Sequence, residues 1–204
     1  MLARMDGTRA KEDLHLYLRT AREALLWKLE GLSEYDVRRP LTPTGTNLLG
    51  LVKHVTGCEV GYFGEPFGRP FPGDLPWLTD DAGPAVDMWA TPGESREEIT
   101  GGYEEACAHA DGTIEALALD ASCDLPGWPG AQGPVTLHRI LVHMTAETHR
   151  HAGHADIVRE LVDGAAGLRP GTSNLPPGDR AWWEGHRARV ERAAREAGAR
   201  VAAR

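Results

Sequence analysis

The sequence predicts an all-α protein, a four-helix bundle with an additional C-terminal helix. Apolar residues recur at three- and four-residue spacings in five separate runs, which is the pattern of amphipathic helices. No stretch shows the strict alternation of apolar and polar residues that is typical of a half-buried strand. We expect a single domain over residues 1–204, with the bundle core at about 10–165 and the helical extension at about 178–200.

The first predicted helix covers residues 12–31, and Gly31 ends it. Its apolar positions are Leu14, Tyr17, Leu18, Leu25 and Leu29. The second predicted helix starts at Thr46, whose hydroxyl can cap it, and runs to Tyr62, with Pro66 beyond its end. Both segments predict helices with one face toward a core.

The third and fourth helices are predicted over 94–118 and 136–162. The third is more polar, and its Gly101-Gly102 pair is unfavourable because each glycine costs about 1 kcal/mol relative to alanine in a helix. The fourth is the longest, since Thr136 can cap its start and Gly164 can end it.

A fifth helix is predicted over 179–199, and we expect it to pack on the bundle through Trp182 and Trp183. The connections between the helices are rich in glycine and proline and cover 64–93, 119–135 and 164–178. Because a loop as long as 64–93 is uncommon without a function, it is either a wall or lid over a site or additional core.

Composition and charge exclude several classes of function. The chain is 41% hydrophobic and 25% charged, as in soluble globular proteins, and its net charge of -8 argues against nucleic acid as the main partner. No run of 18 apolar residues would cross a membrane, and the N-terminal residues lack the apolar stretch of a signal peptide. We therefore expect a cytoplasmic protein. The three cysteines, Cys58, Cys107 and Cys123, lie far apart, form no CxxC pair and are odd in number, which excludes a disulfide framework and a cysteine-rich zinc site.

The fourth predicted helix has polar residues in the middle of its core-facing stripe. At about 100° per residue, five apolar residues lie within about 40° of His151, and so does Glu147. The apolar residues are Ile140, Met144, Ala155, Val158 and Val162. His138 and His149 face the opposite side, and His143 and His154 lie on the flanks. Burying a carboxylate and an imidazole is costly unless both are satisfied.

A divalent metal ion would satisfy both groups, since ligands at i and i+4 lie about 6 Å apart and can converge on one ion. The third ligand must come from another helix, and His54 on the second helix is the best candidate. Two histidines and one carboxylate would leave positions open, as catalytic sites require. The alternative is an internal polar network in which Glu147 and His151 form an ion pair.

Other polar residues near these positions allow two interpretations each. Cys58 is either a thiolate ligand or a small core residue, and Glu59 either supports the site or is paired elsewhere. His143 and His154 are alternative ligands or outer partners of the site. The remaining histidines are interpreted as surface or packing residues: His15, His109, His138, His149 and His186. The sequence has no HExxH, glycine-rich phosphate loop or GxSxG motif, and it identifies no general base.

Two segments, LVKHVTGCE and HMTAETHRHAGHADIVRE, resemble the DinB/YfiT superfamily over roughly residues 10–165. That superfamily consists of metal-binding four-helix bundles, many of them dimers, with one histidine on the second helix and a pair of ligands at i and i+4 late in the chain. The resemblance implies the ligands His54, Glu147 and His151. The more common pattern has histidine where this chain has Glu147, but the mycothiol-dependent maleylpyruvate isomerase branch is similar in using His, Glu and His.

The resemblance implies a metal-dependent thiol S-transferase or isomerase, in which a mycothiol-type thiolate attacks a small electrophile. It implies a divalent ion, with zinc first and nickel, iron or manganese also compatible with the ligands, as well as a low-molecular-weight thiol and a homodimer. Two other functions stay open. The protein is alternatively a metal-dependent hydrolase that uses metal-bound water, or a non-catalytic, ligand-binding DinB-like protein.

Overall fold

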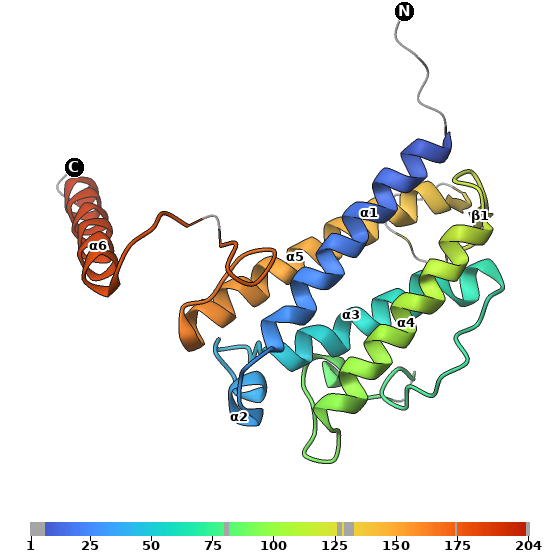
Figure 1. Cartoon of the computed structure of the whole chain (residues 1–204), viewed down its shortest axis with the longest axis horizontal. Helices are drawn as coiled ribbons and strands as arrows, with labels where there is room; N and C mark the ends of the chain where they lie inside the picture. The colour runs from blue at the N-terminus through green and yellow to red at the C-terminus, as the bar shows by residue number, and fades with distance from the viewer. Residues whose placement is uncertain (1–6, 80–81, 126–127, 129–132, 174, 203–204) are drawn as a thin grey trace, which may run out of the picture. The chain divides into compact units, whose positions relative to one another are not determined.

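The computed structural model describes residues 7–79, 82–125, 128, 133–173 and 175–202. Parts of all three predicted connections, and the N-terminal residues 1–6, lie outside the described residues. The predicted all-α class is confirmed, because four long helices run side by side and form a bundle (Figure 1). They are α1 (Gly7–Leu26), α3 (Leu48–Phe63), α4 (Arg96–Ala116) and α5 (Leu137–Asp163).

Short elements connect these helices. They are η1 (Trp27–Leu29), α2 (Glu34–Arg38), η2 (Glu65–Phe67), η3 (Val86–Met88), β1 (Ser122–Cys123) and β2 (Val135–Thr136). The two strands pair antiparallel, with Ser122 opposite Thr136 and Cys123 opposite Val135. The sequence did not predict this ladder, because strands of two residues are too short for an alternating pattern.

Local side-chain chemistry explains where the helices begin and end. At α4, Ser95 and Glu98 form a reciprocal capping box. Thr136 caps α5, and Gly164 ends that helix in the left-handed conformation, both as predicted. The predicted cap of α3 was wrong by one residue: Asn47, not Thr46, accepts a hydrogen bond from the Gly50 amide at 2.8 Å.

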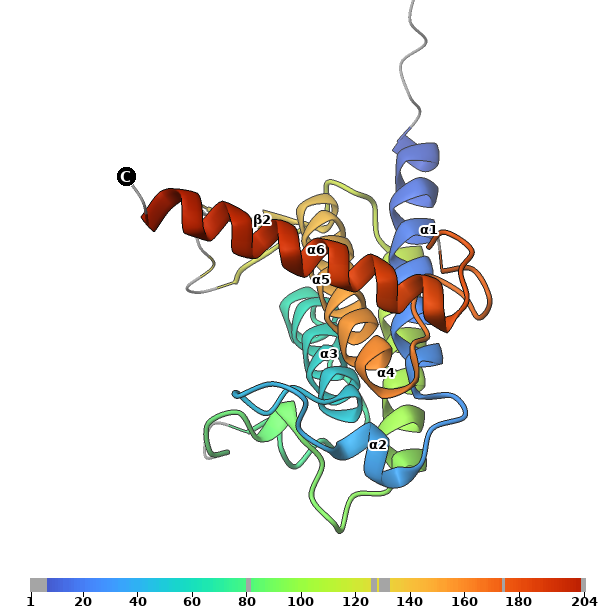
Figure 2. The same ribbon diagram turned by 90° about the vertical axis from the view of Figure 1, so that its left-hand side faces the viewer.

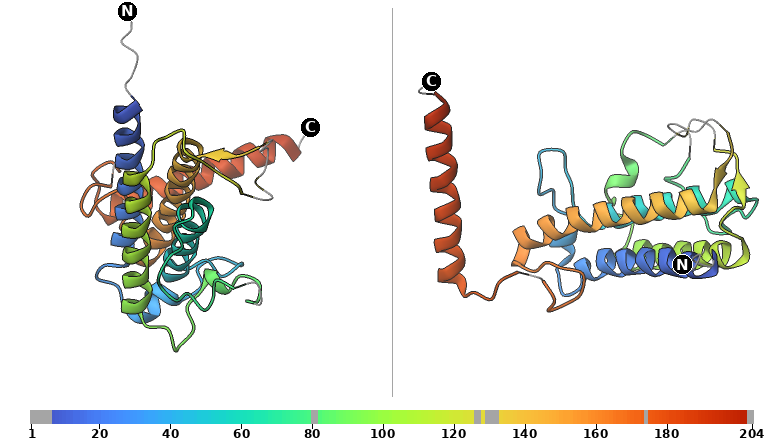
Figure 3. Two further views of the ribbon diagram at one scale, coloured as in Figure 1. Left: turned by 90° about the vertical axis from the view of Figure 1, so that its right-hand side faces the viewer. Right: turned by 90° about the horizontal axis from the view of Figure 1, so that it is seen from above.

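The core lies between the four long helices. Helix α1 packs against α5, and α3 packs against both α4 and α5. The views in Figures 1 and 3 both show this arrangement. The predicted apolar stripe of α5 faces this core. Its members Ile140, Met144, Ala155 and Val158 are buried, and Val162 is half-buried. Because α3 and α5 are neighbours, polar groups on their facing sides can meet.

The chain divides into two compact units, Met1–Ser173 and Asn174–Arg204. The second unit contains α6 (Arg180–Ala202), which is one continuous helix (Figure 2). None of its described residues is buried. Within it the Trp182 and His186 rings stack at 5.4 Å. That α6 packs on the bundle through its tryptophans stays a prediction. None of the described helices is long and apolar enough to cross a membrane.

Candidate metal centre

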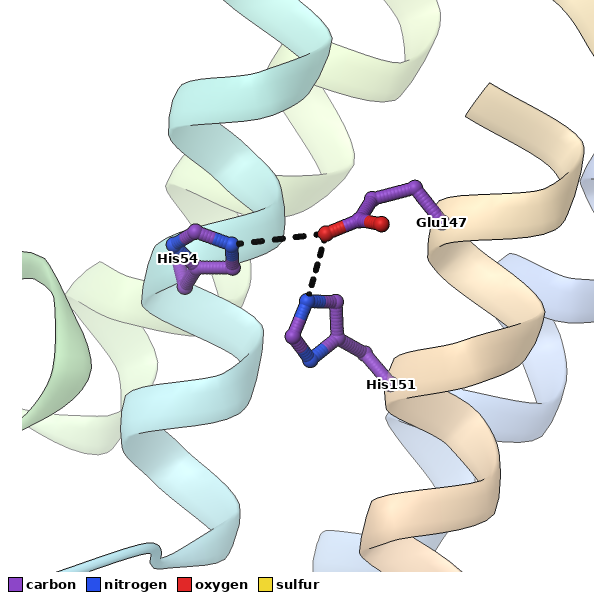
Figure 4. Close-up of side chains that lie close together, drawn as sticks. All are labelled: His54, Glu147 and His151. Atoms are coloured by element: carbon purple, nitrogen blue, oxygen red, sulfur yellow. Dashed lines mark hydrogen bonds and ion pairs between the residues drawn. The ribbon is translucent and has the colours of Figure 1, made fainter. Parts of the chain in front are cut away.

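His54, Glu147 and His151 come together on the facing sides of α3 and α5 (Figure 4). One ligand atom from each residue lies within 4.8 Å of the other two. His151 Nε2 is 2.9 Å from Glu147 Oε1, and His54 Nε2 is 4.0 Å from the same oxygen. Three side-chain atoms of types that bind metal ions therefore lie close together. That they bind a metal stays a prediction.

The spacing along α5 explains how two of these groups share one face. Glu147 and His151 are one helical turn apart, with the buried residues Met144 and Ala155 on either side of them along the stripe. The seam is not fully closed, because the side chain of Glu147 is 21% exposed and that of His54 is 24% exposed. The two side chains are therefore in partial contact with solvent.

The electrostatic setting favours an ionised Glu147 and a neutral His151. Burial raises the pKa of Glu147, but the hydrogen bond to His151, the favourable electrostatic interaction with that ring and the positive charge of Arg150 outweigh it, so the pKa is lowered overall. Burial lowers the pKa of His151, and the nearby His54 adds to this effect, although the hydrogen bond to Glu147 opposes it. These are the protonation states that a metal ion requires of its ligands.

Asp87 is a fourth member of the site, and sequence reasoning missed it. The Nδ1 atom of His54 lies 2.7 Å from Asp87 Oδ2, which η3 supplies from within the long connection 64–93. A three-residue turn has no periodic pattern, so no sequence signal pointed to this aspartate. The connection contributes to the core as well, because Met88 and Ala90 pack against it. The additional-core interpretation of the segment 64–93 thus holds in part, and its role as a wall or lid over a site stays a prediction.

The other sequence candidates lie around the site or elsewhere. Cys58 Sγ is 3.7 Å from His54 Nε2 but is not one of the mutually close ligand atoms. Burial raises the pKa of this thiol to about 12, and the charges of Glu147, Glu59 and Asp87 add to the rise. The Cys58 side chain is packed against the core, in line with the core interpretation.

Glu59 is paired elsewhere, in bidentate hydrogen bonds from Arg22 at 2.7 and 2.6 Å. His143 packs edge-on against the rings of Tyr62 and Trp128, which favours an aromatic contact over a ligand role. His154 is exposed, with its ring 5.3 Å from that of His151. Neither histidine belongs to the converging set.

A cavity of about 530 Å³ lies on another side of α3. Lys53 and Thr56 of α3, Phe71 and Trp77 of the long connection, and the first half of α4 line it. Its lining includes none of the three candidate ligands, so the cavity does not mark the metal centre. The centre is defined by the convergence of donor atoms.

Two comparisons with known proteins bear on this site. The family model for mycothiol S-transferase (MST) matches residues 13–164, a range that contains all three candidate ligands and all four bundle helices apart from the first turn and a half of α1. The search of curated proteins found no match.

Proposed function

The chain belongs to the mycothiol S-transferase family, and from this premise we propose that it is a metal-dependent thiol S-transferase or isomerase. The observation that carries the proposal is the convergence of His54 Nε2, Glu147 Oε1 and His151 Nε2 within 4.8 Å of one another. In this proposal a thiol of the mycothiol type is the nucleophile, and a small electrophile is the second substrate.

The donor set fits a divalent ion. Two imidazole nitrogens and one carboxylate oxygen are ligands that zinc accepts, and three protein ligands leave a position for a substrate. A divalent ion bound there would lower the pKa of a coordinated thiol, so that the thiolate forms at neutral pH. We propose zinc first, although nickel, iron and manganese suit the same donors.

The residues themselves have separable roles in this proposal. Glu147 supplies the single negative charge of the set, while His54 and His151 add neutral donors from two different helices. Because Glu147 and His54 are each more than a fifth exposed, the thiol can approach from the open side of the seam. His151 is buried and forms the inner side of the proposed site.

Two further parts of the proposal rest on the family resemblance: the electrophile is a small molecule, and the protein is a homodimer. We also propose that it works in the cytoplasm, where thiols are kept reduced. Light scattering coupled to size-exclusion chromatography tests the homodimer. A mass of one chain at micromolar concentration would contradict that part alone.

The test of the central proposal is metal content by elemental mass spectrometry on untagged protein. We compare the wild type with His54→Ala, Glu147→Ala and His151→Ala, and follow folding by circular dichroism. We expect about one divalent ion per wild-type chain, and loss of the ion from each variant with the helical signal retained. No ion in the wild type after reconstitution with zinc, nickel, iron or manganese would overturn the proposal.

Activity assays then separate the functions that the sequence left open. The metal-loaded protein is incubated with a panel of small electrophiles, with and without mycothiol. We expect turnover only with the thiol. Turnover without thiol would indicate the hydrolase instead. A folded protein that has no activity and whose folding is unaffected by chelator would indicate the non-catalytic alternative.

A further inference from the structure

Asp87 makes a specific contact with one candidate ligand. Its Oδ2 atom lies 2.7 Å from His54 Nδ1, on the far side of the ring from Glu147 and His151. An ionised carboxylate can only accept a hydrogen bond, so in the neutral ring Nδ1 carries the proton. The other nitrogen, Nε2, then has a free lone pair, and it is this atom that faces Glu147 (Figure 4).

We propose that Asp87 is the positioning residue of the candidate metal centre, and that the turn 85–89, which we name the strap, exists to hold it against His54. This inference rests on the proposed role of His54 as a ligand. A carboxylate on the second nitrogen fixes both the tautomer and the ring orientation of a ligating histidine. Asp87 has the position that this role requires.

The strap is held on α3 by two side chains close to His54 in the sequence. Asn47 donates from Nδ2 to the Met88 carbonyl at 3.1 Å, and Lys53 donates from Nζ to the Trp89 carbonyl at 3.2 Å. Asn47 and His54 are two helical turns apart, so they lie on one side of α3. The helix therefore fixes the ligand and the strap together.

Gly50 allows this close approach. It lies between Asn47 and His54 on α3, and a Cβ atom at this position would be 1.8 Å from the Met88 carbonyl oxygen and 2.4 Å from its carbon. Both are backbone atoms, so any side chain at position 50 would push the strap away. The backbone of Ala85, at the start of the strap, is in the left-handed region with φ 59°, which is rare for alanine. Such a conformation persists only where its surroundings hold it.

The first test reads the His54 ring directly in metal-free protein. Nitrogen-15 NMR of labelled imidazoles, assigned with a His54→Gln variant, distinguishes protonation at Nδ1 from protonation at Nε2. We expect the Nδ1-protonated form in the wild type and a shift toward the Nε2-protonated form in Asp87→Ala. The same tautomer in both proteins would overturn the proposal, and this result does not depend on any metal.

The second test measures zinc affinity by competition with a chromophoric chelator. We expect Asp87→Ala to weaken binding about 10- to 100-fold and Asp87→Asn, which keeps an acceptor oxygen but no charge, to weaken it less. Gly50→Ala should weaken zinc binding in the same way. The double variant Gly50→Ala/Asp87→Ala should bind zinc no more weakly than either single variant, because both changes act through the same contact. Additive losses would show that Gly50 acts independently of Asp87.

Gly61→Ala is the matched control. It makes the same change in the same helix, but nothing lies within 4 Å of the added Cβ, so zinc affinity should stay at the wild-type value. Circular dichroism checks folding, and if Gly50→Ala fails to fold, Asp87→Ala alone decides. If the wild type binds zinc and the Asp87→Ala variant binds it equally tightly, this inference is overturned. A wild type that binds no zinc overturns the proposed function instead.

Discussion

Helix α3 contributes to two polar clusters that differ in how they are buried and paired. In the closed cluster (Arg22, Glu59 and Asp111), Glu59 is fully buried and Arg22 is 5% exposed, while the Asp111 side chain at its edge is 30% exposed. Arg22 donates to both Glu59 oxygens and to Asp111, at 2.6 to 2.7 Å. In the open cluster (His54, Glu147 and His151), two of the three side chains are partly exposed.

The clusters differ in how their carboxylates are balanced. Burial raises the pKa of Glu59, and the Arg22 guanidinium opposes that rise with charge and hydrogen bonds. Burial also lowers the pKa of Arg22, but Glu59 outweighs this and the pKa is raised overall, so the cation is secure. Glu147 has no such buried cation beside it, since the arginine that pairs with it, Arg150, is 66% exposed. A closed ion pair balances its own charges, so that losing one partner is costly, whereas two ring nitrogens close to one carboxylate suit a ligand set.

The largest effect we expect is from removing the cation of the closed cluster. Arg22→Ala leaves the Glu59 charge buried without a partner, and we expect the free energy of unfolding to fall by about 3 to 5 kcal/mol. Urea unfolding in the presence of chelator measures it. Arg150→Ala is the control, because it removes an exposed arginine beside the open cluster and should change stability by no more than about 0.5 kcal/mol. Equal losses from the two variants would contradict the comparison.

A double substitution sharpens this test. Replacing both partners, in Arg22→Met/Glu59→Leu, removes the buried charge together with its counter-charge, and such exchanges are often neutral or stabilising. We expect the double variant to recover most of the stability lost in Arg22→Ala. If it unfolds as readily as Arg22→Ala, the closed cluster does more than balance its own charges.

The second effect separates the clusters through ligand binding. At a zinc concentration about 100 times Kd, binding to the folded state adds about 2.7 kcal/mol to the free energy of unfolding. We expect this gain in the wild type and in Arg22→Met/Glu59→Leu, but not in His54→Ala, as measured by thermal unfolding with and without chelator. Loss of the gain in the double variant would mean that the two clusters are coupled through α3.

Sequence reasoning found the part of the open cluster that lies on one helix. Glu147 and His151 share a face with four buried residues of α5, and this angle follows from spacing alone. The same count put His138 on the opposite side, where it is exposed. His54 could be proposed only as a candidate, because helical spacing fixes directions within a helix and not between two helices.

The remaining parts depend on tertiary packing that no local pattern encodes. Asp87 lies in a turn of three residues, too short to have a periodicity, and this turn approaches α3 closely at Gly50. His15 was interpreted as a surface or packing residue, but its Nε2 lies 2.7 Å from Asp111 Oδ1, at the edge of the closed cluster. Partners from two helices could not be matched without knowing how α1 and α4 are placed.

The smallest change in stability that we expect comes from removing the N-cap of a helix that carries residues of one cluster only. Helix α4 carries Asp111 of the closed cluster but no candidate ligand, and Ser95 caps its start through the amide of Glu98 at 3.1 Å. Ser95→Ala removes that cap, so we expect stability to fall by about 1 kcal/mol with zinc affinity unchanged. A shift in the urea midpoint without a change in slope measures the loss.

Thr136→Ala at the start of α5 is the matched comparison, because this threonine caps the helix that carries Glu147 and His151. Its loss of stability should be similar, since both hydroxyls satisfy one amide at a helix start. Thr136 lies three turns before Glu147, and fraying at a helix end is confined to its first turn, so zinc affinity should again be unchanged. If Thr136→Ala weakens zinc binding and Ser95→Ala does not, the ligand set depends on the stability of the whole of α5, and the open cluster is less independent of the fold than its geometry indicates.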